Sequence, residues 1–192
     1  MIIGVTGRVG VGKSYLVKKL NIKSELFHTI DLDLIGHQLL EDQYVKEKLM
    51  IEFGKEILDG NNMISRPDLS RVVFEGHKQL SVLNQIMHPK IKDEVLNSIK
   101  SMKEKNIIIV GALIKEINLV SECNYIVCVQ ADRKKREQIL NKKIHIERFQ
   151  LDDAQYKEFS DTIFLNDYTK ESVDKFIDLI QNLILFSSKE KK

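Results

Sequence analysis

The sequence predicts an α/β fold in which a sheet of five parallel strands lies between helices in three layers. Two short runs of mostly β-branched residues, 106–111 and 125–129, are typical of strands buried on both faces of a parallel sheet. Helical segments follow the first and second predicted strands, and residues 113–123 form a short connection between the third and fourth. With 192 residues, 43% hydrophobic and 30% charged, the chain is long enough for one such core and a small inserted subdomain.

A glycine-rich loop joins the first predicted strand, residues 1–5, to a helix whose first turns are residues 15–20. Residues 7–14 match the P-loop pattern, which is a glycine, four free positions and Gly-Lys-Ser. Its glycines let several backbone N–H groups turn into one concavity, and the helix adds its positive N-terminal end, so the main chain can hold a polyphosphate. Lys13 would bring a positive charge to the outer phosphates, and Ser14 a hydroxyl to the magnesium ion. The alternative is a plain glycine turn with Lys13 in solvent.

Two carboxylates, Asp31 and Asp33, follow the second predicted strand, residues 26–30. Ligands of open parallel sheets collect at the carboxyl ends of the strands, so both side chains are candidates for chemistry beside the loop. Either aspartate can instead cap the next helix, which the apolar spacing of residues 34–40 predicts. Because a helix start needs only one such cap, a second role remains open for the other carboxylate.

Residues 34–104 are expected to be mostly helical and to form a subdomain that binds a second substrate. A turn at residues 59–62 interrupts them, and a further helix begins at residues 66–68 with proline near its first position. His88 and Pro89 are expected to separate two more helices.

The sheet is expected to close with a strand at residues 162–165, followed by a long amphipathic helix. Apolar residues at helical spacing are expected to face the core: Val173, Phe176, Ile177, Ile180, Leu183 and Ile184. The charged tail, residues 189–192, is expected to be solvated and frayed.

The most basic stretch lies between the last two predicted strands and contains Arg133, Lys134, Lys135, Arg136, Lys142, Lys143 and Arg148. Basic residues here suit a mobile lid that closes over a nucleotide and stabilises the charge of a transferring phosphoryl group. The alternative for each residue is a solvated helix face, and we expect at least one of them to serve the site.

Composition excludes several other classes of protein. A formal net charge of +2 gives no general field for nucleic acid or a membrane surface. The two cysteines, Cys123 and Cys128, are too few for a disulfide framework and are not spaced as a zinc site. We expect no signal peptide or membrane span, and therefore a cytoplasmic location, whereas the oligomeric state carries no signal in the sequence.

Taken in order, these motifs resemble the dephospho-coenzyme A kinases, a family of P-loop kinases of small molecules. The resemblance covers essentially the whole chain. The shared residues are the loop Gly7 to Ser14, Asp31-Leu32-Asp33, Phe53-Gly54 with Ile57-Leu58, Arg66 with Leu69, Val73-Phe74, His88-Pro89, Ala112-Leu113-Ile114 with Glu116, and Asp161 with Asn166. The resemblance implies one P-loop kinase domain over residues 1–192. Its core would be about 1–33, 105–131 and 161–186, its helical insertion about 34–104 and its lid about 132–160.

The resemblance also implies transfer of the γ-phosphate of ATP to the ribose 3′-hydroxyl of dephospho-CoA, with Mg²⁺ as the cofactor. Asp33 would act as the base and Lys13 would stabilise the transferred phosphoryl group, while Ser14 would bind the metal. Arg66 and His88, with Asp33, would lie at the acceptor side. The residues expected to bind ATP are Arg8, Val9, Gly10, Val11, Gly12, Lys13, Ser14 and Tyr15, and the lid candidates are Lys142, Lys143 and Arg148.

Two other functions remain open from the sequence. The same fold could phosphorylate another small acceptor, such as a nucleoside or a nucleoside monophosphate. Alternatively, the chain could bind ATP as a regulator and catalyse no transfer. Val110 favours this alternative, because related kinases often carry a carboxylate at the position of Val110. The presence of Asp33 argues against the second alternative, since a protein that only binds ATP needs no carboxylate at the acceptor position.

Overall fold

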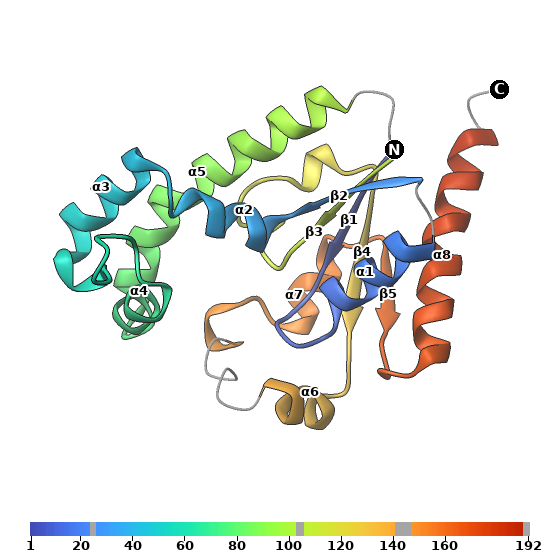
Figure 1. Cartoon of the computed structure of the whole chain (residues 1–192). Helices are drawn as coiled ribbons and strands as arrows, with labels where there is room; N and C mark the ends of the chain where they lie inside the picture. The colour runs from blue at the N-terminus through green and yellow to red at the C-terminus, as the bar shows by residue number, and fades with distance from the viewer. Residues whose placement is uncertain (24–25, 103–105, 141–146, 190–192) are drawn as a thin grey trace. The chain divides into compact units, whose positions relative to one another are not determined.

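The computed structural model describes residues 1–23, 26–102, 106–140 and 147–189 (Figure 1). Two compact units are distinguished, one formed by Met1–Asp31 with Ser98–Lys192 and the other by Leu32–Asn97. The strands are β1 (Ile2–Thr6), β2 (Phe27–Asp31), β3 (Asn106–Val110), β4 (Tyr125–Gln130) and β5 (Thr162–Leu165). The helices are α1 (Lys13–Lys23), α2 (Leu32–Leu39), α3 (Gln43–Phe53), α4 (Arg66–Val73), α5 (His77–Ser101), α6 (Arg133–Leu140), α7 (Asp153–Glu158) and α8 (Lys170–Lys189), with short 3₁₀ turns at Lys55–Ile57 and Val120–Glu122.

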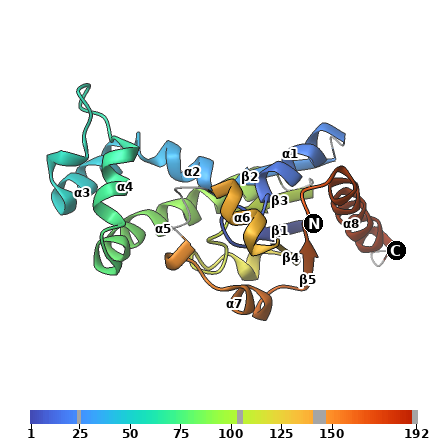
Figure 2. The same ribbon diagram turned by 90° about the horizontal axis from the view of Figure 1, so that it is seen from below.

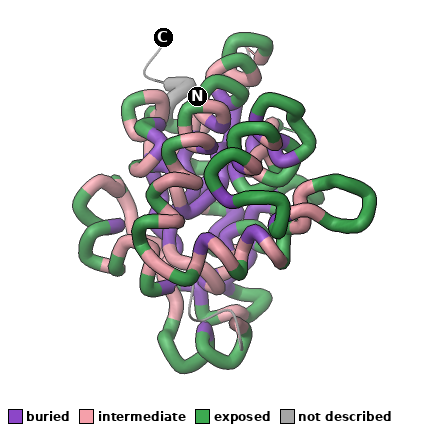
Figure 3. Tube along the Cα trace, turned by 90° about the vertical axis from the view of Figure 1, so that its left-hand side faces the viewer, coloured by how far each residue is buried: buried purple, intermediate pink, exposed green. Residues whose placement is uncertain are grey.

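The first unit contains a five-stranded sheet in the order β2-β3-β1-β4-β5, and every neighbouring pair is parallel. This confirms the predicted α/β fold with five parallel strands. The central strands β1, β3 and β4 are almost fully buried. Figure 3 colours the chain by burial, with buried residues in purple. Their β-branched residues suit strands covered on both faces, where no polar side is needed.

Helices α1 and α8 cover one face of the sheet, while α7 and the segment after β3 cover the other (Figure 2). On the first face, Leu16 and Leu20 of α1 and Phe176 of α8 pack with Ile3 of β1 in one buried cluster. On the other face a Cβ at Gly4 would lie 3.1 Å from the sulfur of Cys123, so this strand leaves little space there. The two layers hold β1 rigidly, and β1 ends where the glycine-rich loop begins.

The second unit is helical and contains α2, α3, α4 and most of α5. Ser65 caps α4, accepting a hydrogen bond from the Asp68 N–H group, and Pro67 stands in the first turn, where a missing N–H costs nothing. The predicted turn at residues 59–62 is present, since the Asp59 carboxylate accepts from the N–H groups of Asn61 and Met63.

One prediction about this unit is wrong: His88 and Pro89 do not separate two helices. Helix α5 runs without interruption through Pro89. A proline removes one helical hydrogen bond and leaves the carbonyl four residues earlier, that of Gln85, without its partner. Both Pro89 and Gln85 are exposed, so water can satisfy that carbonyl and the helix continues.

Candidate functional site

The loop between β1 and α1 has the backbone conformation that its glycines permit. Gly7, Gly10 and Gly12 have φ angles of 132°, 82° and 91°, a region that other residues rarely enter. Gly7 also packs against the backbone of β4, because a Cβ there would lie 2.2 Å from the carbonyl oxygen of Val129. Val11 is fully buried and anchors the middle of the loop in the core. The loop therefore has little freedom to change shape.

Lys13 begins α1 and turns its side chain back across the loop. Its ammonium group donates hydrogen bonds to the carbonyl oxygens of Gly7, at 2.7 Å, and Arg8, at 2.9 Å. The side chain is 8% exposed, so the positive charge lies inside the curve of the loop rather than in solvent. A buried cation and a helix N-terminus on one small concavity form a site suited to a polyanion. Ser14, next in the helix, is exposed.

The turn between β5 and α8 supports the loop from a second side. Asn166 is 3% exposed, and its side-chain amide donates to the carbonyl oxygen of Val11 at 2.8 Å. The hydroxyl of Tyr168 donates to the carbonyl oxygen of Gly10 at 2.9 Å, and burial raises the pKa of this phenol, which keeps it protonated. A mainly apolar pocket of about 300 Å³ opens here, and its walls are Gly10, Gly12, Tyr15, Ile139, Asn166, Tyr168 and Val173.

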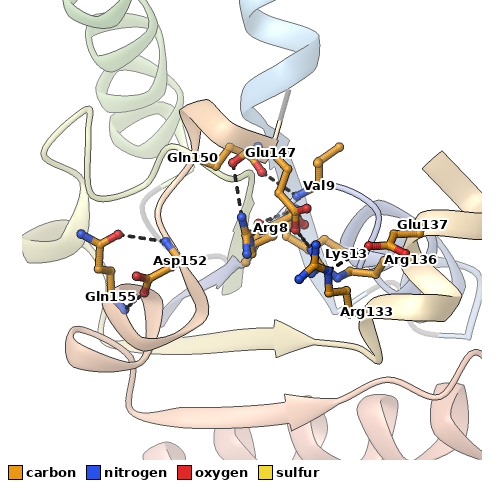
Figure 4. Close-up of polar contacts among 11 residues, drawn as sticks. Arg8, Val9, Lys13, Arg133, Arg136, Glu137, Glu147, Gln150, Asp152 and Gln155 are labelled. Carbon is orange, nitrogen blue, oxygen red and sulfur yellow. Dashed lines mark hydrogen bonds and ion pairs between the residues drawn. The ribbon is translucent and has the colours of Figure 1, made fainter. Parts of the chain in front are cut away.

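A third support comes from residues 147–150, shown in Figure 4. The carboxylate of Glu147 forms ion pairs with Arg8 of the loop, at 3.0 Å, and with Arg136 of α6. The side chain of Gln150 accepts a hydrogen bond from the backbone N–H of Val9 at 2.8 Å. This segment therefore contacts two consecutive residues of the loop.

Glu116 lies in the segment after β3, six positions beyond the last residue of the strand, Val110. Burial raises the pKa of its carboxyl group, and Oε2 is buried without a hydrogen-bond partner among the described residues. The fully buried Tyr156 of α7 fixes the same segment by donating to the carbonyl oxygen of Ala112 at 3.0 Å. Glu116 is thus a partly buried carboxyl group in the segment that follows β3.

The predicted site residues fall into three groups. Residues 8–15 are brought together in the loop and the first turn of α1. Asp33, Arg66 and His88 belong to the second unit, where Asp33 lies in the first turn of α2, two positions after β2 ends. Arg66 begins α4 and His88 lies within α5; Asp33 and Arg66 are exposed, and His88 is half-buried.

The lid candidates are divided between described and undescribed parts of the chain. Lys142 and Lys143 lie outside the described residues. Arg148 is exposed, and its guanidinium group lies 4.6 Å from the centre of the Phe149 ring. The basic stretch also contains a cation that differs from its neighbours, because Arg136 is 2% exposed whereas Arg133, Lys134 and Lys135 are exposed.

Sequence reasoning did not single out Arg136, Glu147 or Tyr168 as parts of the site. No local signal distinguishes Arg136 from the basic residues beside it, and only the structure shows that Leu140, four positions later on the same helical face, approaches Gly10. Tyr168 adopts a φ of 67°, which no tyrosine pattern predicts. Glu147 is eleven residues from Arg136, and no local spacing connects them.

Comparison with known proteins adds independent information. A family model described as dephospho-CoA kinase matches residues 1–171. The chain is 37% identical to a dephospho-CoA kinase of Borrelia garinii over 131 residues, 68% of this chain and 62% of the relative. It is 38% identical to that of Fusobacterium nucleatum over 136 residues, 69% of this chain and 67% of the relative.

The fold is also similar to that of solved structures. The dephospho-CoA kinase from Campylobacter jejuni superimposes with a TM-score of 0.61 at 19% identity, covering 94% of this chain and 96% of that one. At this identity the likeness concerns the fold alone. The family match spans both the glycine-rich loop and the helical unit. This chain belongs to the dephospho-CoA kinase family.

Proposed function

We propose that this protein transfers the γ-phosphate of ATP to the ribose 3′-hydroxyl of dephospho-CoA. The observation that carries the proposal is the family match over residues 1–171, which includes an intact Gly7 to Ser14 loop and Asp33. The sequence match spans 62% of the length of the Borrelia relative. ATP and dephospho-CoA are the small-molecule partners in this proposal, and the cytoplasm is the compartment. Among the described residues, no helix is both long and apolar enough to cross a membrane.

The loop would hold the phosphates of ATP. Backbone N–H groups at the start of α1 and the ammonium of Lys13 offer positive charge to the β- and γ-phosphates. To reach a phosphate, the ammonium exchanges its bonds to the carbonyls of Gly7 and Arg8 for the charged phosphate oxygens, a stronger type of hydrogen bond. The base of ATP would occupy the apolar pocket of about 300 Å³, whose walls include Tyr15 and Tyr168.

Magnesium suits the donors that this site offers. Among the described residues, no three His, Cys, Asp or Glu side chains gather as a metal site. Mg²⁺ commonly takes most of its ligands from phosphates and water and only one or two from protein, so the exposed hydroxyl of Ser14 fits this need. When bound, the ion neutralises charge on the β- and γ-phosphates.

Asp33 would act as the base, accepting the proton of the acceptor hydroxyl or orienting it for in-line attack. Arg66 and His88 would bind the acceptor in the helical unit. Lys142, Lys143 and Arg148 are the cations proposed to close over the nucleotide. Phosphoryl transfer requires mainly positioning and charge stabilisation, so one carboxylate and a few cations are sufficient.

Asp33→Asn tests the assignment of the base, and Asp31→Asn is its matched control. We expect Asp33→Asn to reduce kcat by about 10²-fold or more while the Kd for MgATP changes less than about twofold. Asp31, the last residue of β2, should tolerate the amide with a much smaller loss. Equal turnover in Asp33→Asn and wild type would refute the assignment. Phosphorylation of a nucleoside monophosphate but not of dephospho-CoA would instead refute the proposed acceptor.

A further inference from the structure

Three charged side chains form a largely buried ionic cluster beside the glycine-rich loop (Figure 4). Glu147 lies between two guanidinium groups and contacts both with the same oxygen, Oε1. Arg136 and Glu147 are 2% and 8% exposed, and the side chain of Arg8 is 19% exposed. Charges this deeply buried are expensive to desolvate, so removing one member leaves another without compensation.

The cluster is joined to the loop at more than one point. Arg8 also donates from Nη2 to the backbone oxygen of Glu147 at 3.3 Å, and Gln150 holds the N–H group of Val9. Arg8 and Val9 stand between Gly7 and Gly10, both of which have positive φ angles. Residues 147–150 therefore hold the two loop residues that lie between these glycines.

The same contacts reach Lys13 through the backbone. The carbonyl oxygen of Arg8 accepts a hydrogen bond from the Lys13 ammonium at 2.9 Å. When Glu147 holds the Arg8 side chain, it also restricts the peptide that carries this carbonyl. A continuous series of contacts thus runs from Arg136 through Glu147 and Arg8 to Lys13.

We propose that Arg136, Glu147 and Arg8 are positioning residues that hold the backbone of the glycine-rich loop in the conformation that binds MgATP. This inference rests on the proposed function for one point, which is that the nucleotide bound by the loop is MgATP. Its mechanism is preorganisation, because a loop already in its bound shape loses less conformational entropy on binding. Arg8 supplies the connection from within the loop, and Arg136 holds Glu147 from α6.

Glu147→Gln separates positioning from simple electrostatic attraction. Loss of the carboxylate removes a negative charge near the phosphates, so attraction alone predicts tighter MgATP binding. Loss of positioning predicts weaker binding. Titration calorimetry of the full chain with MgATP should give a Kd increased about tenfold or more for Glu147→Gln. The KM for dephospho-CoA should change less than about twofold, since the contacts of Glu147 join the loop and α6.

Two further variants test whether the cluster acts as a unit. Arg8→Met combined with Glu147→Gln should weaken MgATP binding no more than the more damaging of the two single changes, because both break the ion pair between Arg8 and Glu147. Arg8→Lys should lie between wild type and Arg8→Met. The matched control is Glu137→Gln, which breaks the exposed ion pair with Arg133 on α6 and should leave the Kd unchanged.

Several results would overturn the proposal. Tighter MgATP binding by Glu147→Gln would mean that the carboxylate competes with the nucleotide for the arginines. A lower melting temperature with an unchanged Kd would reduce the cluster to a structural role. If Glu147→Gln does not fold, Arg8→Met decides the question, because in that variant the ion pair between Glu147 and Arg136 remains. The increase in Kd caused by Arg8→Met must then persist at 0.5 M salt, where long-range attraction is screened. Wild-type binding of MgATP without transfer to dephospho-CoA would refute the proposed function and leave this comparison intact.

Discussion

Replacing Gly7 with alanine tests how closely the loop is fitted to the sheet. The residue has a φ of 132°, and its added Cβ would lie 2.2 Å from the carbonyl oxygen of Val129. Ordinary contact begins at 3.4 Å, and the obstructing atom belongs to the backbone of β4, which cannot turn aside as a side chain can. The strands β1 and β4 would therefore have to separate locally by about 1 Å.

The cost can be estimated from two contributions. Forcing alanine into this backbone region costs about 1–3 kcal/mol. Separating the strands breaks at least one buried backbone hydrogen bond, which costs about 1–3 kcal/mol more. The free energy of unfolding should thus fall by about 2–6 kcal/mol, a large part of the roughly 5–15 kcal/mol that a domain has.

Urea unfolding followed by circular dichroism at 222 nm, without nucleotide, measures this loss. Gly10→Ala is the matched control in the same loop, because its φ of 82° carries similar strain but the three atoms nearest its new Cβ belong to the side chain of Leu140, which can shift more readily than the backbone of a strand. Gly60→Ala controls for the substitution itself, since no atom lies within 4 Å of its added Cβ. An unfolding midpoint for Gly7→Ala equal to that of Gly10→Ala would refute the proposed contact with β4.

Three further predictions follow from buried polar groups. Because burial raises the pKa of Glu116, the folded state binds the proton of this carboxyl group more tightly than the unfolded state does. The stability of the wild type should therefore fall as pH rises from 4.5 through the folded pKa. The melting temperature of Glu116→Gln, measured over the same pH range, should lack this part of the decrease. Burial raises the pKa of the Cys123 thiol to about 12 and that of Cys128 to about 11, so both should react slowly with a thiol reagent at pH 8 and rapidly in denaturant. Tyr156→Phe should cost about 1–3 kcal/mol in urea unfolding because the buried carbonyl of Ala112 loses its donor, and an unchanged midpoint would contradict this.

Much of the sheet could be predicted because its strands carry a local signal. The run at residues 162–165 coincides with β5, and the runs at 106–111 and 125–129 differ from β3 and β4 by one residue at one end. β-branched residues buried on both faces have few alternatives to a central strand. The loop was equally predictable, because each glycine in it satisfies a backbone requirement that only glycine meets without strain.

What the sequence did not reveal depends on contacts between distant residues. Pro89 was expected to end a helix, but whether a proline breaks a helix depends on whether the carbonyl four residues earlier finds another partner, and here both Pro89 and Gln85 are exposed residues that water can reach. The burial of Arg136 depends on Glu147, which lies beyond the end of α6. A run of basic residues, taken by itself, favours a solvated helix face. Only the contact with Glu147 distinguishes Arg136 from the basic residues beside it.

The most direct test of the proposed reaction is mass analysis of dephospho-CoA incubated with the protein and MgATP. The account predicts that the acceptor gains one phosphate, that ADP appears in equal amount, and that Lys13→Ala abolishes both. Dephospho-CoA that stays unmodified, while calorimetry shows that the same preparation binds MgATP, would contradict the proposed function.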